Sequence, residues 1–304
     1  MDKGNRTTME FIFISFSNVP ELQYFLFTSF LCIYSISMAA HMFLIVLYNL
    51  SSNLHTPMYF FLANFSFLEE CYISTITPNM LKNLLSDDKT ITFYGCAVQM
   101  YCFLLLGSTE CYLLAAMAYD RYNAICHPLL YNVIMSRNAC VKLIVNSWLI
   151  GLMAAIIQTS LTFSLPFCGP NKINHFYCDI PPVMALACTD TKFNEIVTFI
   201  IVLLLIVGAF LLTIVSYTRI IWTIIKYHST AGIKKAFSTC TSHLIVVTIF
   251  YGSASTMYLR PKSTYGTDMD KFISLMYTVI APLLNPFIYS LRNNEVKYAL
   301  LQLW

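Results

Sequence analysis

The chain has 304 residues, of which 58% are hydrophobic, 15% aromatic and 11% charged, and its formal net charge is +3. Soluble domains carry about 25% charged residues, so this composition excludes an ordinary soluble protein and predicts an all-α membrane protein. We expect the lipid bilayer as its surroundings and no nucleic-acid partner.

Charge-free stretches predict a bundle of seven transmembrane helices, because a crossing helix needs about 20 mostly apolar residues. The predicted spans are 23–50, 57–82, 92–122, 141–162, 195–222, 236–260 and 271–291, within a single domain that covers 1–304. We expect 1–22 to form an extracellular tail and 292–304 a short amphipathic helix on the cytoplasmic side. The apolar run at 11–16 is too short for a cleavable signal.

Two features place the N-terminus outside the cell. A glycosylation sequon begins at Asn5 in the polar tail. Cys168, Cys178 and Cys188 lie in the loop between the fourth and fifth spans, and Cys96 begins the third span. Four thiols on one face indicate an oxidising compartment, although four cysteines allow three pairings. Lys and Arg are divided evenly between the two faces, so the positive-inside rule does not decide the orientation.

The segment MAYDRYNAICHPLLY at 117–131 places Asp120 beside Arg121 where the third span ends. An ionised residue near bilayer depth is costly unless it is paired, so the pair indicates a latch with two states. The alternative is an arginine that simply extends to the lipid headgroups.

Five segments make the chain resemble the vertebrate olfactory receptors, a branch of the rhodopsin-like G-protein-coupled receptors. They are LHTPMYFFLANFSFLEE at 54–70, the segment at 117–131, SYTRI at 216–220, KAFSTCTSHL at 235–244 and PLLNPFIYSLRNNEV at 282–296. The resemblance implies a non-enzymatic plasma-membrane receptor that binds a small-molecule odorant. It also implies activation of a heterotrimeric stimulatory G protein, a rise in cyclic AMP, and the disulfides Cys96–Cys178 and Cys168–Cys188.

The resemblance further implies a switch at the inner end of the bundle. Asp120 would hold Arg121 at rest and release it toward the G protein on activation. Pro286 breaks the seventh span, frees a backbone carbonyl and creates a hinge. The remaining switch residues that the family pattern assigns are Tyr217, Lys234, Lys235, His243, Asn285 and Tyr289. Headgroup anchoring is the alternative interpretation of the two lysines.

Helical spacing places candidate ligand-binding residues on single faces of four spans. They are Phe103, Leu104, Gly107, Ser108 and Cys111 on the third span, Ile201, Val202, Leu205 and Ile206 on the fifth, Tyr251, Ser255 and Tyr258 on the sixth, and Leu275 and Thr278 on the seventh. An apolar wall with a few hydroxyls suits a small, mainly apolar volatile molecule. Ordinary helix packing is the alternative for any one of them. Because 100–108 has no acid and 272–291 has no lysine, amine and retinal ligands are disfavoured.

Glu69 and Glu110 are acids at membrane depth, and two close carboxylates in a low dielectric need a cation or a proton. The resemblance places both acids around the family's sodium site, with Asn285 nearby, and we expect no other cofactor. His41 stands where the family usually has asparagine, and it is either a pH-dependent partner of these acids or a neutral hydrogen-bonding substitute. His175 and Cys178 could ligate a soft metal only if Cys178 were not in a disulfide.

One alternative from another class is a seven-helix transporter or ion channel that uses the intramembrane acids. The chain shows no internal repeat and no paired broken helices, which such transporters commonly have.

Overall fold

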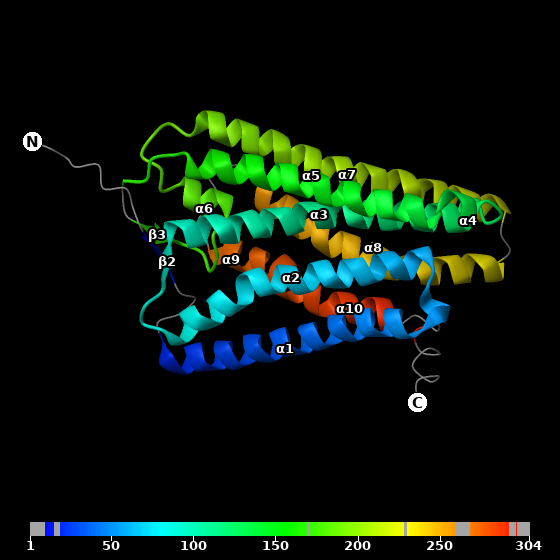
Figure 1. Ribbon diagram of the computed structural model, residues 1–304, viewed down its shortest axis with the longest axis horizontal. Helices are drawn as coiled ribbons and strands as arrows, with labels where there is room; N and C mark the ends of the chain where they lie inside the picture. The colour runs from blue at the N-terminus through cyan, green and yellow to red at the C-terminus, as the bar shows by residue number, and fades with distance from the viewer. Residues whose placement is uncertain are drawn as a thin grey trace, which may run out of the picture.

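The computed structural model describes the backbone of residues 10–14, 19–168, 171–227, 230–259, 268–291 and 296, with the side chains of 227, 230–239, 268, 290 and 291 left out. Long helices run side by side in an elongated bundle (Figure 1). They are α1 (Pro20–Leu50), α2 (Pro57–Leu85), α3 (Phe93–Cys126), α5 (Arg137–Phe163), α7 (Lys192–Tyr227), α8 (Thr230–Tyr258) and the pair α9 (Asp268–Leu275) and α10 (Ala281–Leu291). Two short helices, α4 (Tyr131–Ile134) and α6 (Ile180–Met184), lie between long ones.

Five of these helical stretches are long and apolar enough to cross a membrane by length and composition. They are α1, α3, α5, the stretch Lys192–Lys226 of α7, and Met269–Tyr289. α2 and α8 lie in the same bundle but, over their described residues, are not among these five stretches. α2 carries the adjacent acids Glu69 and Glu70. The structure therefore supports a helical membrane bundle.

Most of the helices extend past the predicted spans because capping residues, and not hydropathy, decide where they end. Pro20 and Pro57 occupy the first turns of α1 and α2, where a missing N–H costs nothing. Thr92 caps α3 by accepting a hydrogen bond from the Gly95 amide at 3.1 Å. Helix α3 ends before His127, which precedes a proline.

A small sheet at one end of the bundle departs from the predicted all-α fold, and one of its strands lies within the predicted N-terminal tail. Strand β1 (Glu10–Phe13) pairs antiparallel with β2 (Thr90–Thr92) and parallel with β3 (Lys172–Ile173), giving the order β2-β1-β3. Phe11 and Phe13 are buried against the cluster that contains Cys96 and Cys178. The apolar run that was too short for a signal is long enough for a strand. We call this end the disulfide end, and the opposite end, which carries Asp120 and Arg121, the arginine end.

The last long helix is irregular in the middle. A π-helical segment, Met276–Ile280, separates α9 from α10, and Pro286 lies inside α10. Such interruptions mark functional positions in many helices. The amphipathic helix predicted at 292–304 and the sequon at Asn5 lie outside the described residues, apart from residue 296.

Candidate ligand cavity and switch

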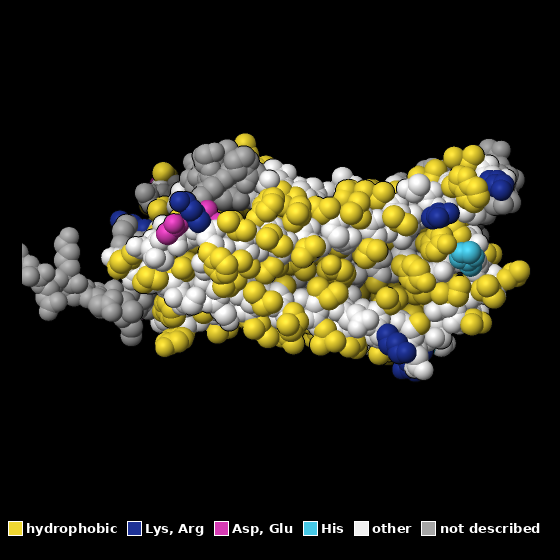
Figure 2. Space-filling model, turned by 90° about the horizontal axis from the view of Figure 1, so that it is seen from above, with side chains coloured by type: hydrophobic (Ala, Val, Ile, Leu, Met, Phe, Trp, Pro, Cys, Tyr) yellow, Lys and Arg dark blue, Asp and Glu magenta, His cyan; other side chains and the backbone are white. Residues whose placement is uncertain are grey.

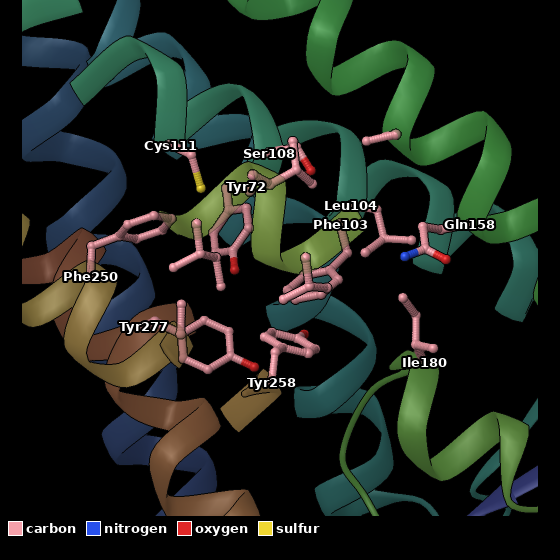
Figure 3. A pocket seen from close by; sticks show the side chains of 16 residues that line it. Tyr72, Phe103, Leu104, Ser108, Cys111, Gln158, Ile180, Phe250, Tyr258 and Tyr277 are labelled. Carbon is pink, nitrogen blue, oxygen red and sulfur yellow. The ribbon is translucent and has the colours of Figure 1, made fainter. Parts of the chain in front are cut away.

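A cavity of about 70 Å³ lies inside the bundle toward the disulfide end (Figure 3). It is lined by Tyr72, Phe103, Leu104, Gly107, Ser108, Cys111, Ala154, Gln158, Ile180, Val202, Leu205, Ile206, Phe250, Ala254, Tyr258 and Tyr277. The walls are largely apolar, and the tyrosine, serine and glutamine side chains supply scattered polar atoms. Such a site can enclose a small apolar molecule and orient it with one or two hydrogen bonds.

The structure brings together most of the residues chosen from helical spacing. All five candidates on α3 line the cavity, as do Val202, Leu205 and Ile206 of α7 and Tyr258 of α8. Among the described residues, its lining does not include Ile201, Tyr251, Ser255, Leu275 or Thr278. Tyr251 donates a hydrogen bond to the Cys111 carbonyl at 2.6 Å, and Thr278 donates to the Ser274 carbonyl at 2.7 Å. The Tyr251 hydroxyl therefore joins α8 to α3, whereas the Thr278 hydroxyl bonds to the preceding turn of its own helix.

Several lining residues were not predicted because they come from elements whose inward face the sequence does not reveal. Tyr72 belongs to α2 and Gln158 to α5, and Ile180 belongs to the short helix α6 in the loop. Gln158 also joins α5 to α7, because its Oε1 accepts a hydrogen bond from the Thr198 hydroxyl at 3.0 Å.

The loop that carries α6 is fixed over the cavity. The two expected disulfides are present, with Cα–Cα distances of 5.5 Å for Cys96–Cys178 and 5.9 Å for Cys168–Cys188. The Cys178 amide also donates to Oε1 of Gln99 at 3.0 Å. The loop is therefore tied to α3 by a covalent bond and a hydrogen bond.

A buried carboxylate that was not predicted lies beside the cavity. Asp179 is fully buried, and it accepts hydrogen bonds from the Tyr258 hydroxyl at 2.9 and 3.0 Å and from the Tyr177 hydroxyl at 3.2 Å. The Tyr177 hydroxyl is also hydrogen-bonded to that of Tyr277 at 2.8 Å. A lining tyrosine thus connects the cavity to an acid in the loop. In the sequence, Asp179 directly follows Cys178, so the disulfide of Cys178 fixes the position of the aspartate.

Asp179 and His175 give the loop two titrating groups of opposite effect. Burial raises the pKa of Asp179 to about 6, against the hydrogen bonds of Tyr258, the Ile180 amide and Tyr177. Burial, and then the charge of Lys271, lowers the pKa of His175 to about 3. The stability contributed by protonated Asp179 is therefore lost as the pH rises from about 4 to about 6. The contribution of neutral His175 is instead lost as the pH falls below about 6.5.

Replacing Asp179 by asparagine is expected to remove the first of these two effects. The shift of the Asp179 pKa corresponds to ~3 kcal/mol at most, so the melting temperature of the intact receptor should carry a component that decreases as the pH rises from about 4 to about 6. The Asp179→Asn variant should lack this component and keep the opposing histidine effect. Thermal melts across this pH range test it, and parallel curves for the two proteins would contradict it.

The soft-metal interpretation of His175 and Cys178 is wrong. Cys178 is in a disulfide, and Nε2 of His175 is hydrogen-bonded to the Ser274 hydroxyl at 3.1 Å. Within the described part of the chain, no group of three or more His, Cys, Asp or Glu side chains could hold a metal ion.

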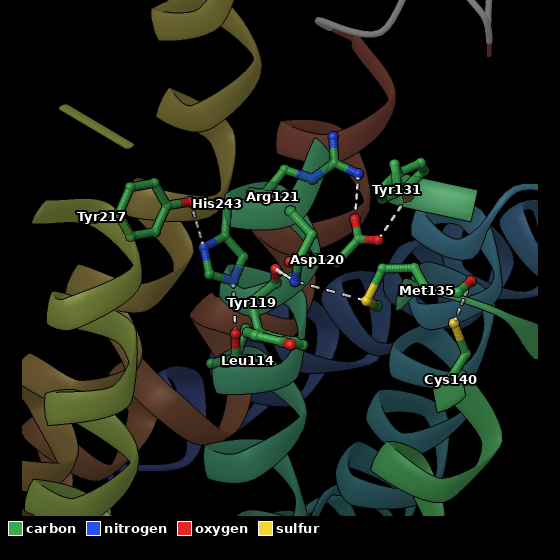
Figure 4. A network of polar contacts seen from close by, with 10 residues as sticks. Leu114, Tyr119, Asp120, Arg121, Tyr131, Met135, Cys140, Tyr217 and His243 are labelled. Atoms are coloured by element: carbon green, nitrogen blue, oxygen red, sulfur yellow. Dashed lines mark hydrogen bonds and ion pairs between the residues drawn. The ribbon is translucent and has the colours of Figure 1, made fainter. Parts of the chain in front are cut away.

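At the arginine end, Asp120 and Arg121 form the pair expected from their positions (Figure 4). Nη2 of Arg121 donates to Oδ2 of Asp120 at 2.6 Å, and the two side chains are 12% and 1% exposed. The Tyr131 hydroxyl of α4 donates to the other carboxylate oxygen at 2.7 Å. Both oxygens of Asp120 are therefore occupied, and Tyr131 is a member of the latch that was not predicted.

A second polar link joins α3, α7 and α8 near this pair (Figure 4). His243 Nε2 lies 3.1 Å from the Leu114 carbonyl, and its Nδ1 lies 2.8 Å from the Tyr217 hydroxyl. A carbonyl only accepts, so Nε2 carries the proton and Nδ1 of the neutral ring accepts from Tyr217. Tyr217 and His243, two of the candidate switch residues, thus connect α7 and α8 to α3. The side chains of Lys234 and Lys235 lie outside the described residues.

The polar layer between the cavity and the switch contains several buried groups whose hydrogen-bonding capacity is incompletely used. Asn285 donates to Oε1 of Glu69, while Oε2 of Glu69, Oε2 of Glu110, Oδ1 of Asn285 and the Tyr289 hydroxyl have no partner in the described structure. These are oxygen ligands of the kind that hard cations prefer. The donor set therefore fits a sodium ion or shared protons.

His41 donates a hydrogen bond to the backbone carbonyl that Pro286 leaves without a helical donor. Pro286 has no N–H to donate to the carbonyl of Pro282, four residues earlier, and Nε2 of His41 donates to that oxygen at 2.9 Å. We expect His41→Asn to preserve this hydrogen bond and His41→Ala to lower the melting temperature by roughly 2–5 °C, since a buried carbonyl would lose its donor. Equal melting temperatures for the alanine and asparagine variants would contradict this role.

A membrane bundle with an apolar cavity near one end of α3 and an acid–arginine latch at the other has the organisation of a rhodopsin-like G-protein-coupled receptor. The sequence profile of the family described as "Olfactory receptor" matches residues 30–304. The chain belongs to this family, which makes it an odorant-sensing receptor and not an enzyme.

Individual relatives match over nearly their whole length. The chain is 51% identical to human olfactory receptor 10A3, over 100% of the chain and 97% of the relative. It is 50% identical to human olfactory receptor 10A7, over 95% and 92%. It is 47% identical to mouse olfactory receptor 5G25, over 99% and 95%.

Proposed function

We propose that this receptor binds a small, mainly apolar odorant in the cavity and activates a stimulatory G protein of the olfactory type, which raises cyclic AMP. The observation that carries the proposal is that both sites are built on α3. Phe103, Gly107 and Ser108 line the cavity, and Arg121 lies near the other end of the same helix, paired with Asp120. A ligand that moves α3 or α8 at the cavity would act on the Asp120–Arg121 pair and the His243 link together.

The proposed topology has α2 and α8 crossing the bilayer together with the five more apolar helices, giving seven spans in one receptor domain. The disulfide end would face the outside of the plasma membrane, since two disulfides need an oxidising compartment. The N-terminus and a glycan on Asn5 would lie on that side, and the arginine end would face the cytosol.

The polar layer is proposed to couple the two sites. Glu69 and Glu110 would hold a sodium ion or a proton at rest, with Asn285 as a further oxygen donor. The oxygens without partners in this layer support the proposal. The His41–Pro282 hydrogen bond favours a structural role for His41 over competition with sodium.

Gly107→Val tests the cavity as the ligand site. A Cβ at Gly107 would lie 3.6 Å from Tyr72, an ordinary contact, so the helix tolerates it while the added methyl groups enter the cavity. We expect odorant potency in a cyclic AMP assay to fall at least ~10-fold, because the cavity becomes smaller and the ligand loses contacts with its walls. Cell-surface abundance should stay near that of the intact receptor.

The control is Gly252→Ala on α8, where an added Cβ meets nothing within 4 Å. It should leave potency unchanged. Ser108→Ala and Tyr258→Phe then test the individual hydroxyls. Unchanged potency in Gly107→Val, Ser108→Ala and Tyr258→Phe would move the ligand site elsewhere.

A further inference from the structure

A second hollow opens on the outside of the bundle toward the arginine end. It has a volume of about 660 Å³ and lies between α5 and α7, with α3 as its floor. The described hydrogen bonds between α5 and α7, Thr198 to Gln158 and Asn194 to Leu161, lie near the disulfide end. Toward the arginine end the groove separates these two helices. We call this hollow the α5–α7 groove.

The chemistry of the α5–α7 groove changes along its length. Ala116, Leu143 and Val215 contribute apolar walls, and Val215 is 59% exposed, so its side chain faces the groove and the bilayer. Asn146 is exposed in the groove, and its side-chain amide makes no hydrogen bond to the described residues. An exposed amide on a lipid-facing helix is costly unless something bonds to it.

The arginine end of the groove is basic. Arg219 of α7 lines it and is exposed. Lys142 lies four residues before Asn146 on α5, and residues at this spacing share a helix face. Asp120 is the described acid at this end of the bundle, and it is buried and bonded to Arg121. Figure 2 shows hydrophobic side chains across the middle of this face and basic side chains at both ends, whereas the acidic side chains in this view lie only near the left-hand end.

We propose that the α5–α7 groove binds one anionic phospholipid. An acyl chain lies on α3 between α5 and α7, the acidic headgroup rests on Arg219 and Lys142, and the Asn146 amide donates to the glycerol ester region. Charge complementarity selects an anionic lipid over a zwitterionic one. The assignment to the inner leaflet rests on the orientation given under the proposed function. The groove also contains Tyr119 and Tyr122, which flank Asp120 and Arg121 in sequence, so the lipid contacts the helix that carries the latch.

Native mass spectrometry of the purified receptor, titrated with palmitoyl-oleoyl phosphatidylserine or the matching phosphatidylcholine, tests the proposal without odorant or G protein. We expect a saturable phosphatidylserine adduct at least ~5-fold tighter than the phosphatidylcholine adduct. Arg219→Gln and Lys142→Gln should each weaken it about 5-fold, the effect of one basic residue at an anionic surface. Val215→Trp, which fills the groove while keeping all charges, should weaken both lipids.

Arg137→Gln is the matched control. This variant removes the same charge from the exposed start of α5, but Arg137 lies five residues before Lys142, a spacing that places the two side chains on different faces of the helix. Arg137 instead acts electrostatically on Tyr48 of α1. The variant should leave the adduct unchanged. Equal binding of the two lipids, equal loss in Arg137→Gln, no effect of Val215→Trp, or equally tight binding of soluble glycerophosphoserine would each overturn the proposal.

Discussion

Arg121→Ala is expected to reduce odorant-dependent cyclic AMP production to less than ~10% of that of the intact receptor, because a contact to the G protein would be lost along with the latch. The Arg121 side chain is largely buried and paired with Asp120 at 2.6 Å, so under the proposed mechanism it reaches the G protein only when the pair opens. The measurement is a cyclic AMP dose response normalised to receptor at the cell surface.

Two further variants separate the charge from the geometry. Arg121→Lys keeps the charge but loses the planar fork, so it should retain only part of the response. Asp120→Asn weakens the hold on Arg121 and should raise the signal without ligand. A full response in Arg121→Ala, or no change in basal signal in Asp120→Asn, would mean that the pair is not the switch.

Gly151→Ala is expected to destabilise the bundle more than other small substitutions on α5. A Cβ at Gly151 would lie 2.2 Å from Oγ1 of Thr109 and 2.6 Å from the Leu105 carbonyl oxygen of α3. Neither atom can retreat easily, because Thr109 donates to that same carbonyl at 2.7 Å. The two helices must separate, and we expect a melting temperature lower by roughly 5 °C or more.

Gly252→Ala is again the matched control. The same added methyl group meets no atom within 4 Å, and alanine is the better helix former by ~1 kcal/mol, so the melting temperature should stay constant or rise. Close approach through small residues is a common basis of helix packing in membranes. Equal melting temperatures for the two variants would show that α3 and α5 are not tightly packed at Gly151.

Local properties of the chain predicted much of the fold and the Asp120–Arg121 ion pair. Charge-free stretches located the long helices within a few residues, since burial in lipid leaves a direct mark on composition. The ion pair could be predicted because Asp120 and Arg121 are neighbours in sequence. The family resemblance correctly paired Cys96 with Cys178 and Cys168 with Cys188.

Contacts between distant segments could not be predicted in the same way. Strand β1 pairs with segments about 80 and 160 residues away, and no periodicity in four residues reveals such partners. Asp179 is connected to the cavity by the hydrogen bond from Tyr258, and Asp120 accepts a second hydrogen bond from Tyr131. Each of these pairs depends on how a loop or short helix returns to the bundle. The pattern of residues along one helix does not reveal the path of the loop that follows it.

In the proposed mechanism, a ligand in the cavity controls a G protein through the Asp120–Arg121 pair. The most direct measurement is the cyclic AMP response to an odorant panel in cells that lack the olfactory stimulatory G protein, before and after that protein is restored. We expect a concentration-dependent response that appears only on restoration and shifts to higher odorant concentration in Gly107→Val. An odorant-dependent membrane current without the G protein would contradict it and favour a channel.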